Sequence, residues 1–110
     1  MFVKNNEGKK FSLAKGITSK ILGHGGKLML VENHFKEGVV APMHSHENEQ
    51  TAYIAKGKFE FTIGDEKQIL ETGDSFYVEA NVPHGCVAIE EGIVVDIFTP
   101  QREDFLKKVD

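Results

Sequence analysis

Residues 38–57 read GVVAPMHSHENEQTAYIAKG and combine two short strand-like stretches with a polar turn between them. The first stretch ends in a His-X-His triplet formed by His44 and His46, and the second begins at Gln50. Side chains at positions i and i+2 of a β-strand project from the same face, so the two imidazoles can converge on one ion. Neighbouring histidines can also be ordinary polar surface residues, and this stretch alone leaves both interpretations open.

Short strands separated by glycine-containing turns are expected on both sides of this segment. Eleven glycines fall at short intervals, and glycine suits hairpin turns because it adopts positive φ at little steric cost. Residues 59–63 alternate apolar and polar side chains, as does a strand with one buried face. Only residues 102–109 have helical periodicity, and a short helix or turn packed across the barrel is expected there. The expected strands are 17–23, 27–35, 39–44, 50–55, 58–63, 67–70, 75–79, 85–90 and 93–99.

This pattern of elements predicts an all-β fold. About nine short strands without interior helices favour a sandwich or barrel, since closure removes exposed sheet edges. A chain of 110 residues has the usual size of one domain, so we expect a single domain over residues 1–110.

Composition narrows the classes of function. Apolar residues make up 40% of the chain and charged residues 27%, and no apolar run approaches the ~20 residues of a membrane span. The N-terminal residues show no secretory signal, and Cys86 is the only cysteine, so a cytoplasmic protein without disulfides is expected. The net charge is −4 with 13 scattered Lys and Arg residues, which argues against nucleic acid and favours a small-molecule partner.

A third imidazole strengthens the interpretation of residues 38–57 as a metal site. His84 follows Pro83 at a loop-to-strand junction, in a chain with only five histidines. Three imidazole nitrogens and the Gln50 amide oxygen, with one or two positions left for water or substrate, make a reasonable catalytic metal shell. We expect one divalent ion, and such a shell accepts nickel, zinc, iron, manganese or copper.

The spacing of these residues resembles that of the cupin superfamily. The first cupin motif is Gly-X5-His-X-His-X3–4-Glu-X6-Gly, and its spacing is kept at Gly38, His44, His46, Gln50 and Gly57. The second cupin motif is Gly-X5-Pro-X-Gly-X2-His-X3-Asn, and its spacing is kept from Gly73 to His84. Only Gly73 and His84 carry over, because the Pro, Gly and Asn positions hold Glu79, Asn81 and Ala88. The resemblance implies a double-stranded β-helix, or jelly roll, with the metal inside the barrel mouth.

Gln50 departs from the glutamate that most cupins carry at this position, although a subset of cupins does use glutamine. A neutral ligand leaves the site one charge more positive than a shell of three histidines and a glutamate. The change is expected to strengthen Lewis acidity and to favour anionic ligands.

The last expected strand adds a second group of polar residues. It places Asp96 and Phe98 on one face and aliphatic residues on the other. If the aliphatic face packs on the core, Asp96 points toward the cavity; otherwise Asp96 lies on the solvent face. Arg102 follows, and it can be a solvated arginine that pairs with Glu103 or Asp104.

The ending VDIFTPQREDF, residues 95–105, resembles that of small cupins of the pectin-degradation type. The resemblance implies ring opening of 4,5-unsaturated uronate monosaccharides to linear keto-aldehydes, with three His and one Gln as metal ligands. It further implies that Asp96, Phe98 and Arg102 line the site. Arg102 would then clamp the substrate carboxylate, Asp96 would move the proton, and Phe98 would form an apolar wall. Similar cupins often pair their first strands across a homodimer.

Two other functions remain open at this point. A metal-dependent dioxygenase would use the same open coordination positions for oxygen, and iron content with oxygen consumption would identify it. A non-enzymatic sensor barrel would bind a sugar or small acid tightly without turnover.

Overall fold

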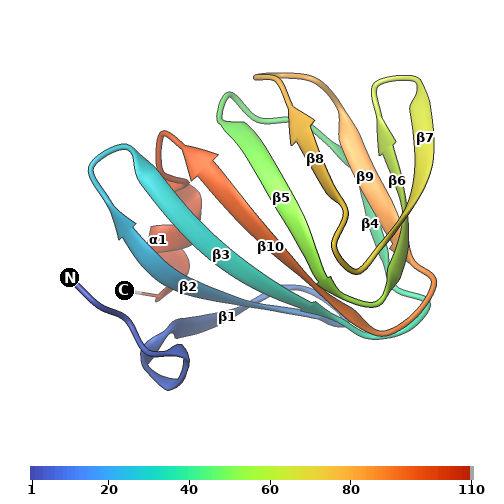
Figure 1. The fold of residues 1–110 in the computed structure, drawn as a ribbon. Helices are drawn as coiled ribbons and strands as arrows, with labels where there is room; N and C mark the ends of the chain where they lie inside the picture. Colours follow the sequence, from blue (N-terminus) through green and yellow to red (C-terminus); the bar gives the residue numbers. More distant parts are fainter. Residues whose placement is uncertain (110) are drawn as a thin grey trace.

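The computed structural model describes residues 1–109, which form two antiparallel sheets, a 3-10 turn η1 (Asn5–Glu7) and one helix (Figure 1). The six-stranded sheet contains, in spatial order, β1 (Lys9–Ala14), β2 (Ile17–Gly25), β3 (Leu28–Phe35), β10 (Gly92–Thr99), β5 (Glu49–Lys56) and β8 (Ser75–Val78). The four-stranded sheet contains β4 (Val40–His44), β9 (His84–Ala88), β6 (Lys58–Ile63) and β7 (Glu66–Glu71). The expected all-β jelly-roll arrangement is confirmed.

All the expected strands are present, with ends shifted by up to a few residues, but the sequence analysis missed β1. This strand lies at the edge of its sheet and pairs only with β2 (Figure 1). Its sequence KKFSLA buries Phe11 and leaves the other five residues exposed. Short, lysine-bearing strands are common at sheet edges, where charge discourages further pairing. The pairing with β2, rather than local sequence pattern, therefore defines β1.

Two apolar clusters form the core, one between the two sheets and one between the six-stranded sheet and the helix. The larger one is built around Phe35 and Phe59, whose rings meet edge to face with centroids 5.1 Å apart. The second lies under α1 (Glu103–Val109), where the Phe105 ring packs against Phe11 and Phe98 at centroid distances of 5.0 and 5.7 Å. The expected C-terminal helix is thus confirmed. Its Phe105 ring packs the helix against β1, near the N-terminal end of the chain.

Backbone conformation explains two features of the cupin motifs. Gly57 has φ +93°, and a Cβ there would lie 2.6 Å from the carbonyl oxygen of Glu91, so a side chain is excluded. Asn81 stands where the second motif has glycine, yet it adopts φ 67°. Asparagine tolerates this left-handed conformation better than most residues, so the turn before His84 is retained despite the substitution.

None of the helices within residues 1–109 is long and apolar enough to cross a membrane.

Candidate metal centre

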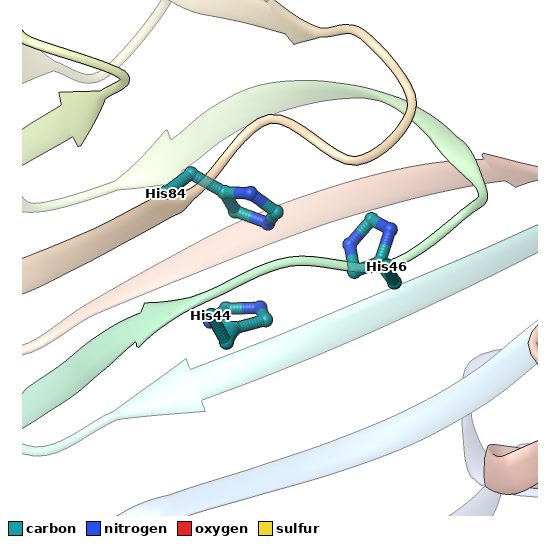
Figure 2. Close-up of side chains that lie close together, drawn as sticks. All are labelled: His44, His46 and His84. Carbon is teal, nitrogen blue, oxygen red and sulfur yellow. The ribbon is translucent and has the colours of Figure 1, made fainter.

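Three imidazoles from separate parts of the two motifs converge on one point (Figure 2). His44 ends β4, His46 follows in the next segment, and His84 begins β9, where it is the register partner of His44. One ligating nitrogen from each ring can be chosen so that all three lie within 4.8 Å of one another. Such a cluster is typical of the cupin metal site and could hold an ion.

Backbone carbonyls fix which nitrogen of each ring is protonated. The contacts are His44 Nδ1 to Pro42 O at 3.0 Å, His46 Nδ1 to Asn48 O at 3.0 Å and His84 Nδ1 to Val82 O at 2.9 Å. A carbonyl oxygen only accepts hydrogen bonds, so each Nδ1 must donate. In the neutral ring, Nε2 then carries a lone pair, which is the form that binds a metal.

The Nε2 atom of His84 shows most clearly that the site suits a cation. It is buried and has no hydrogen-bond partner among the described residues. Burial is also the main reason that the pKa of His84 falls to about 4, and burial lowers the pKa of His46 as well. Leaving a buried polar atom unpaired costs about 1–3 kcal/mol, and a bound ion would remove this cost.

Gln50 offers a fourth donor from β5. Its side-chain Nε2 donates to Asp96 Oδ1 at 2.8 Å, which turns its oxygen Oε1 toward the histidines. This oxygen lies 3.1 Å from His46 Nε2. With Nδ1 of His46 protonated, the two facing atoms are both acceptors and cannot satisfy each other. A cation shared by both would satisfy them, so the donor set fits a divalent ion.

The histidine cluster opens onto a cavity of 280 Å³. Six of the seven site residues expected from the sequence line it: His44, Gln50, His84, Asp96, Phe98 and Arg102. The seventh, His46, meets the Phe98 ring edge to face at 5.7 Å. The structure therefore brings together all seven residues, which span positions 44–102 of the chain.

Asp96 points inward, although the sequence argument for this orientation had the two faces of β10 reversed. Val94 and Phe98, on the same face as Asp96, are buried in the core, whereas Ile97 on the aliphatic face is 40% exposed. The inward face admits a carboxyl here because the amides of Gln50 and Asn33 both donate to it. Burial raises the pKa of Asp96 to about 7, against the opposing effect of these hydrogen bonds.

Arg102 both pairs with a neighbouring carboxylate and lines the cavity, so it fits both interpretations given in the sequence analysis. Its Nε and Nη2 donate to the Asp104 carboxylate at 3.1 and 2.9 Å, as the solvated-tail alternative anticipated. The guanidinium also stacks on Phe105, 4.0 Å from the ring centroid, and lines the cavity. Within the described part of the chain, Nη1 makes no hydrogen bond.

Sequence reasoning missed Asn33, which also lines the cavity and is only 3% exposed. A signal for it existed. The inward-facing positions of β3 are Met29, Val31, Asn33 and Phe35. A lone polar residue in such an apolar series requires a hydrogen-bonding partner inside the fold.

Residues 31–98 match the family model of the cupin domain, so the chain belongs to the cupin family. It is 44% identical to the pectin degradation protein KdgF of Dickeya dadantii (strain 3937) over 96 residues, which cover 86% of this chain and 87% of that protein. The structure of KdgF from Halomonas sp. matches with a TM-score of 0.89 and 36% identity, covering 96% of this chain and 97% of that one. An RmlC-like cupin from Shewanella frigidimarina NCIMB 400 matches with a TM-score of 0.90 and 33% identity, covering 94% of each chain. The resemblance to pectin-degradation cupins is confirmed.

The depressed pKa of His84 predicts acid sensitivity of the metal-free protein. An unfolded imidazole takes up a proton below about pH 6.5, whereas folded His84 resists until about pH 4. The resulting stability is present above pH 6.5 and is lost as the pH falls through this window. Between pH 7 and pH 4 we expect the free energy of unfolding of chelator-treated protein to fall by about 3 kcal/mol more than that of His84→Gln. Urea titrations at pH 7 and pH 4 measure the unfolding free energy of each protein. An equal loss of stability in the chelator-treated protein and in His84→Gln would contradict the prediction.

Proposed function

We propose that this protein holds one divalent metal ion through His44, His46, Gln50 and His84 and opens the ring of 4,5-unsaturated uronate monosaccharides. The observation that carries the proposal is the shared cavity, where the histidine cluster lies beside the partly buried carboxyl of Asp96 and the guanidinium of Arg102. This combination suits a small anionic sugar. The likeness to a pectin degradation protein supports the same substrate class.

When bound, the ion would supply Lewis acidity that stabilises negative charge on a sugar oxygen as the hemiacetal opens. The overall change is an isomerisation. The anomeric hydroxyl loses its proton and forms the aldehyde while the bond from C1 to the ring oxygen breaks. The resulting enolate takes up one proton at C4, equivalent to the one that the anomeric hydroxyl lost, and becomes a ketone, so atoms and electrons balance without a further reactant.

Asp96 is proposed to move the proton. Its carboxyl faces the cavity, and its pKa of about 7 allows it to accept and return a proton near neutral pH. The donating amides of Gln50 and Asn33 hold the carboxyl in one orientation. A single carboxyl can therefore take the anomeric proton and deliver one to the enol carbon.

Arg102 and Phe98 are proposed to orient the substrate. The Asp104 carboxylate binds the Nε and Nη2 edge of the Arg102 guanidinium, and the Phe105 ring packs against its face. These contacts leave Nη1 for the substrate carboxylate. The buried Phe98 ring lies under the guanidinium, 5.0 Å from its central carbon, and offers an apolar surface to the sugar ring. A cation fixed in this way recognises a carboxylate with little loss of side-chain entropy.

The test is to follow the absorbance of the conjugated 4,5-unsaturated uronate with metal-loaded and chelator-treated protein. We expect the absorbance to disappear with the loaded protein and to persist with the stripped one. Persistence with both proteins overturns the reaction. In that case, ligand binding without turnover would identify a sensor barrel, and oxygen consumption with iron would identify a dioxygenase.

Arg102→Lys is expected to reduce kcat/KM about 10–100-fold, mainly through a higher KM. Lysine keeps the charge, but it loses the planar fork and the stacking on Phe105. Steady-state kinetics measure the change, and Lys107→Met on the exposed face of α1 is the matched control. An unchanged KM would remove Arg102 from carboxylate recognition.

A further inference from the structure

A row of buried and partly buried polar side chains crosses the six-stranded sheet toward the metal centre. Ser19 on β2 is fully buried and donates through its hydroxyl to Asn33 Oδ1 at 2.6 Å. Asn33 Nδ2 donates to Asp96 Oδ2 at 2.7 Å and to the carbonyl oxygen of Val94 at 3.2 Å. The other carboxylate oxygen of Asp96 accepts the 2.8 Å hydrogen bond from Gln50.

Each member of this row fixes the orientation of the next. The Val94 carbonyl can only accept, so the amide of Asn33 cannot flip without opposing two oxygens. Its NH₂ group must therefore face Asp96, which keeps the carboxylate edge-on between two amides. The carboxylate in turn requires an NH₂ donor from Gln50, and this leaves the Gln50 oxygen facing His46.

The register of β2, β3 and β10 brings Ser19, Asn33 and Val94 side by side. Asn33 is the Cα partner of Ser19 on β2 and of Val94 on β10, so it lies in the centre of three paired strands. A buried amide at this position is less favourable than an apolar side chain unless all its hydrogen bonds are made. Here its oxygen and its NH₂ group are both satisfied, and the end of the row is a proposed metal ligand.

We propose that Asn33 is a positioning residue for the metal centre, which acts through Asp96 to present the amide oxygen of Gln50 to the ion. Ser19 supports it by holding the Asn33 oxygen. This inference rests on the proposed metal site, and it adds a residue that is not among the four proposed metal ligands. Partners of this kind typically contribute 10–100-fold to metal affinity because they fix the orientation of a ligand.

The test is a double-mutant cycle on metal affinity, measured with cobalt(II) alone and a competing chelator. Asn33→Ala is expected to weaken binding about 10–100-fold in the otherwise unchanged protein. In the Gln50→Ala background the same substitution is expected to have little effect, because the amide that it orients is gone. The cobalt absorption spectrum of Asn33→Ala should also shift toward that of Gln50→Ala.

Val31→Ala is the matched control, since Val31 is buried on the same strand and faces inward, but its apolar side chain takes no part in the row of hydrogen bonds. It is expected to lose stability without changing cobalt affinity. If Asn33→Ala does not fold, Asn33→Leu keeps about the same side-chain volume without any hydrogen-bond donor, and the same loss of affinity is expected.

The outcomes separate this inference from the proposed function. Wild-type affinity in both Asn33 variants, or an equal loss with and without Gln50, overturns the positioning role while the metal site stands. Absence of cobalt binding in the wild type overturns the metal site and this inference together. Cobalt binding with the expected cycle but no turnover of unsaturated uronate overturns only the reaction.

Discussion

Replacing His46 with alanine is expected to weaken divalent-ion binding at least about a thousandfold, or about 4 kcal/mol. The reason is that its Nε2 faces the Gln50 oxygen at 3.1 Å, so the variant loses one nitrogen donor and the partner that defines the position of the oxygen. The effect should exceed the 10–100-fold typical of residues that only support a ligand. Titration with a chelator-buffered ion, or the metal content after gel filtration, measures it.

His34→Ala is the control for this experiment. His34 is an exposed imidazole on β3 whose Nε2 contacts Glu32 at 2.7 Å, outside the cluster. The His34→Ala variant should bind metal with the affinity of the wild type. Similar affinities for His46→Ala and the wild type would show that the ion, if one binds, lies elsewhere.

The second large effect is expected for Asp96→Asn, which should lower turnover of unsaturated uronate about 10²–10⁴-fold at saturating metal. An amide cannot accept and return the proton that the reaction moves. It also offers only one acceptor oxygen to the two amides that donate to Asp96, so one of those hydrogen bonds is lost. Stopped-flow or steady-state absorbance measures turnover, and metal analysis of the same sample shows whether the ion is retained.

Glu32→Gln provides the matched carboxyl-to-amide control. Glu32 lies on β3 but bonds to Asn5 and His34 away from the cavity. Turnover of unsaturated uronate by the Glu32→Gln variant should equal that of the wild type. Undiminished turnover in Asp96→Asn would remove this carboxyl from the chemistry.

Much of the fold could be predicted because its signals are local. Glycine turns and alternating residues indicate most strands without reference to the rest of the chain. The edge strand β1 was missed because its place depends on pairing with β2, a contact that its own sequence only weakly indicates. The jelly-roll topology was predicted from the spacing of the cupin motifs, because strand propensity alone does not determine topology.

The site residues could be named from the sequence, but their environment could not. Spacing indicated the histidines and Gln50, whereas the inward orientation of Asp96 depends on donors from two other strands. The stacking of Arg102 on Phe105 requires the final helix to fold back over β1. Asn33 was missed because its role comes from three strands meeting at one point.

Anomalous diffraction from crystals of the purified protein, recorded at the absorption edge of the metal that it carries, tests the central claim most directly. We expect one peak per chain, about 2.0–2.3 Å from the Nε2 atoms of His44, His46 and His84 and from the Gln50 oxygen. A peak at another position, a Gln50 side chain turned away from the ion, or no peak after soaking with a divalent metal would contradict the account.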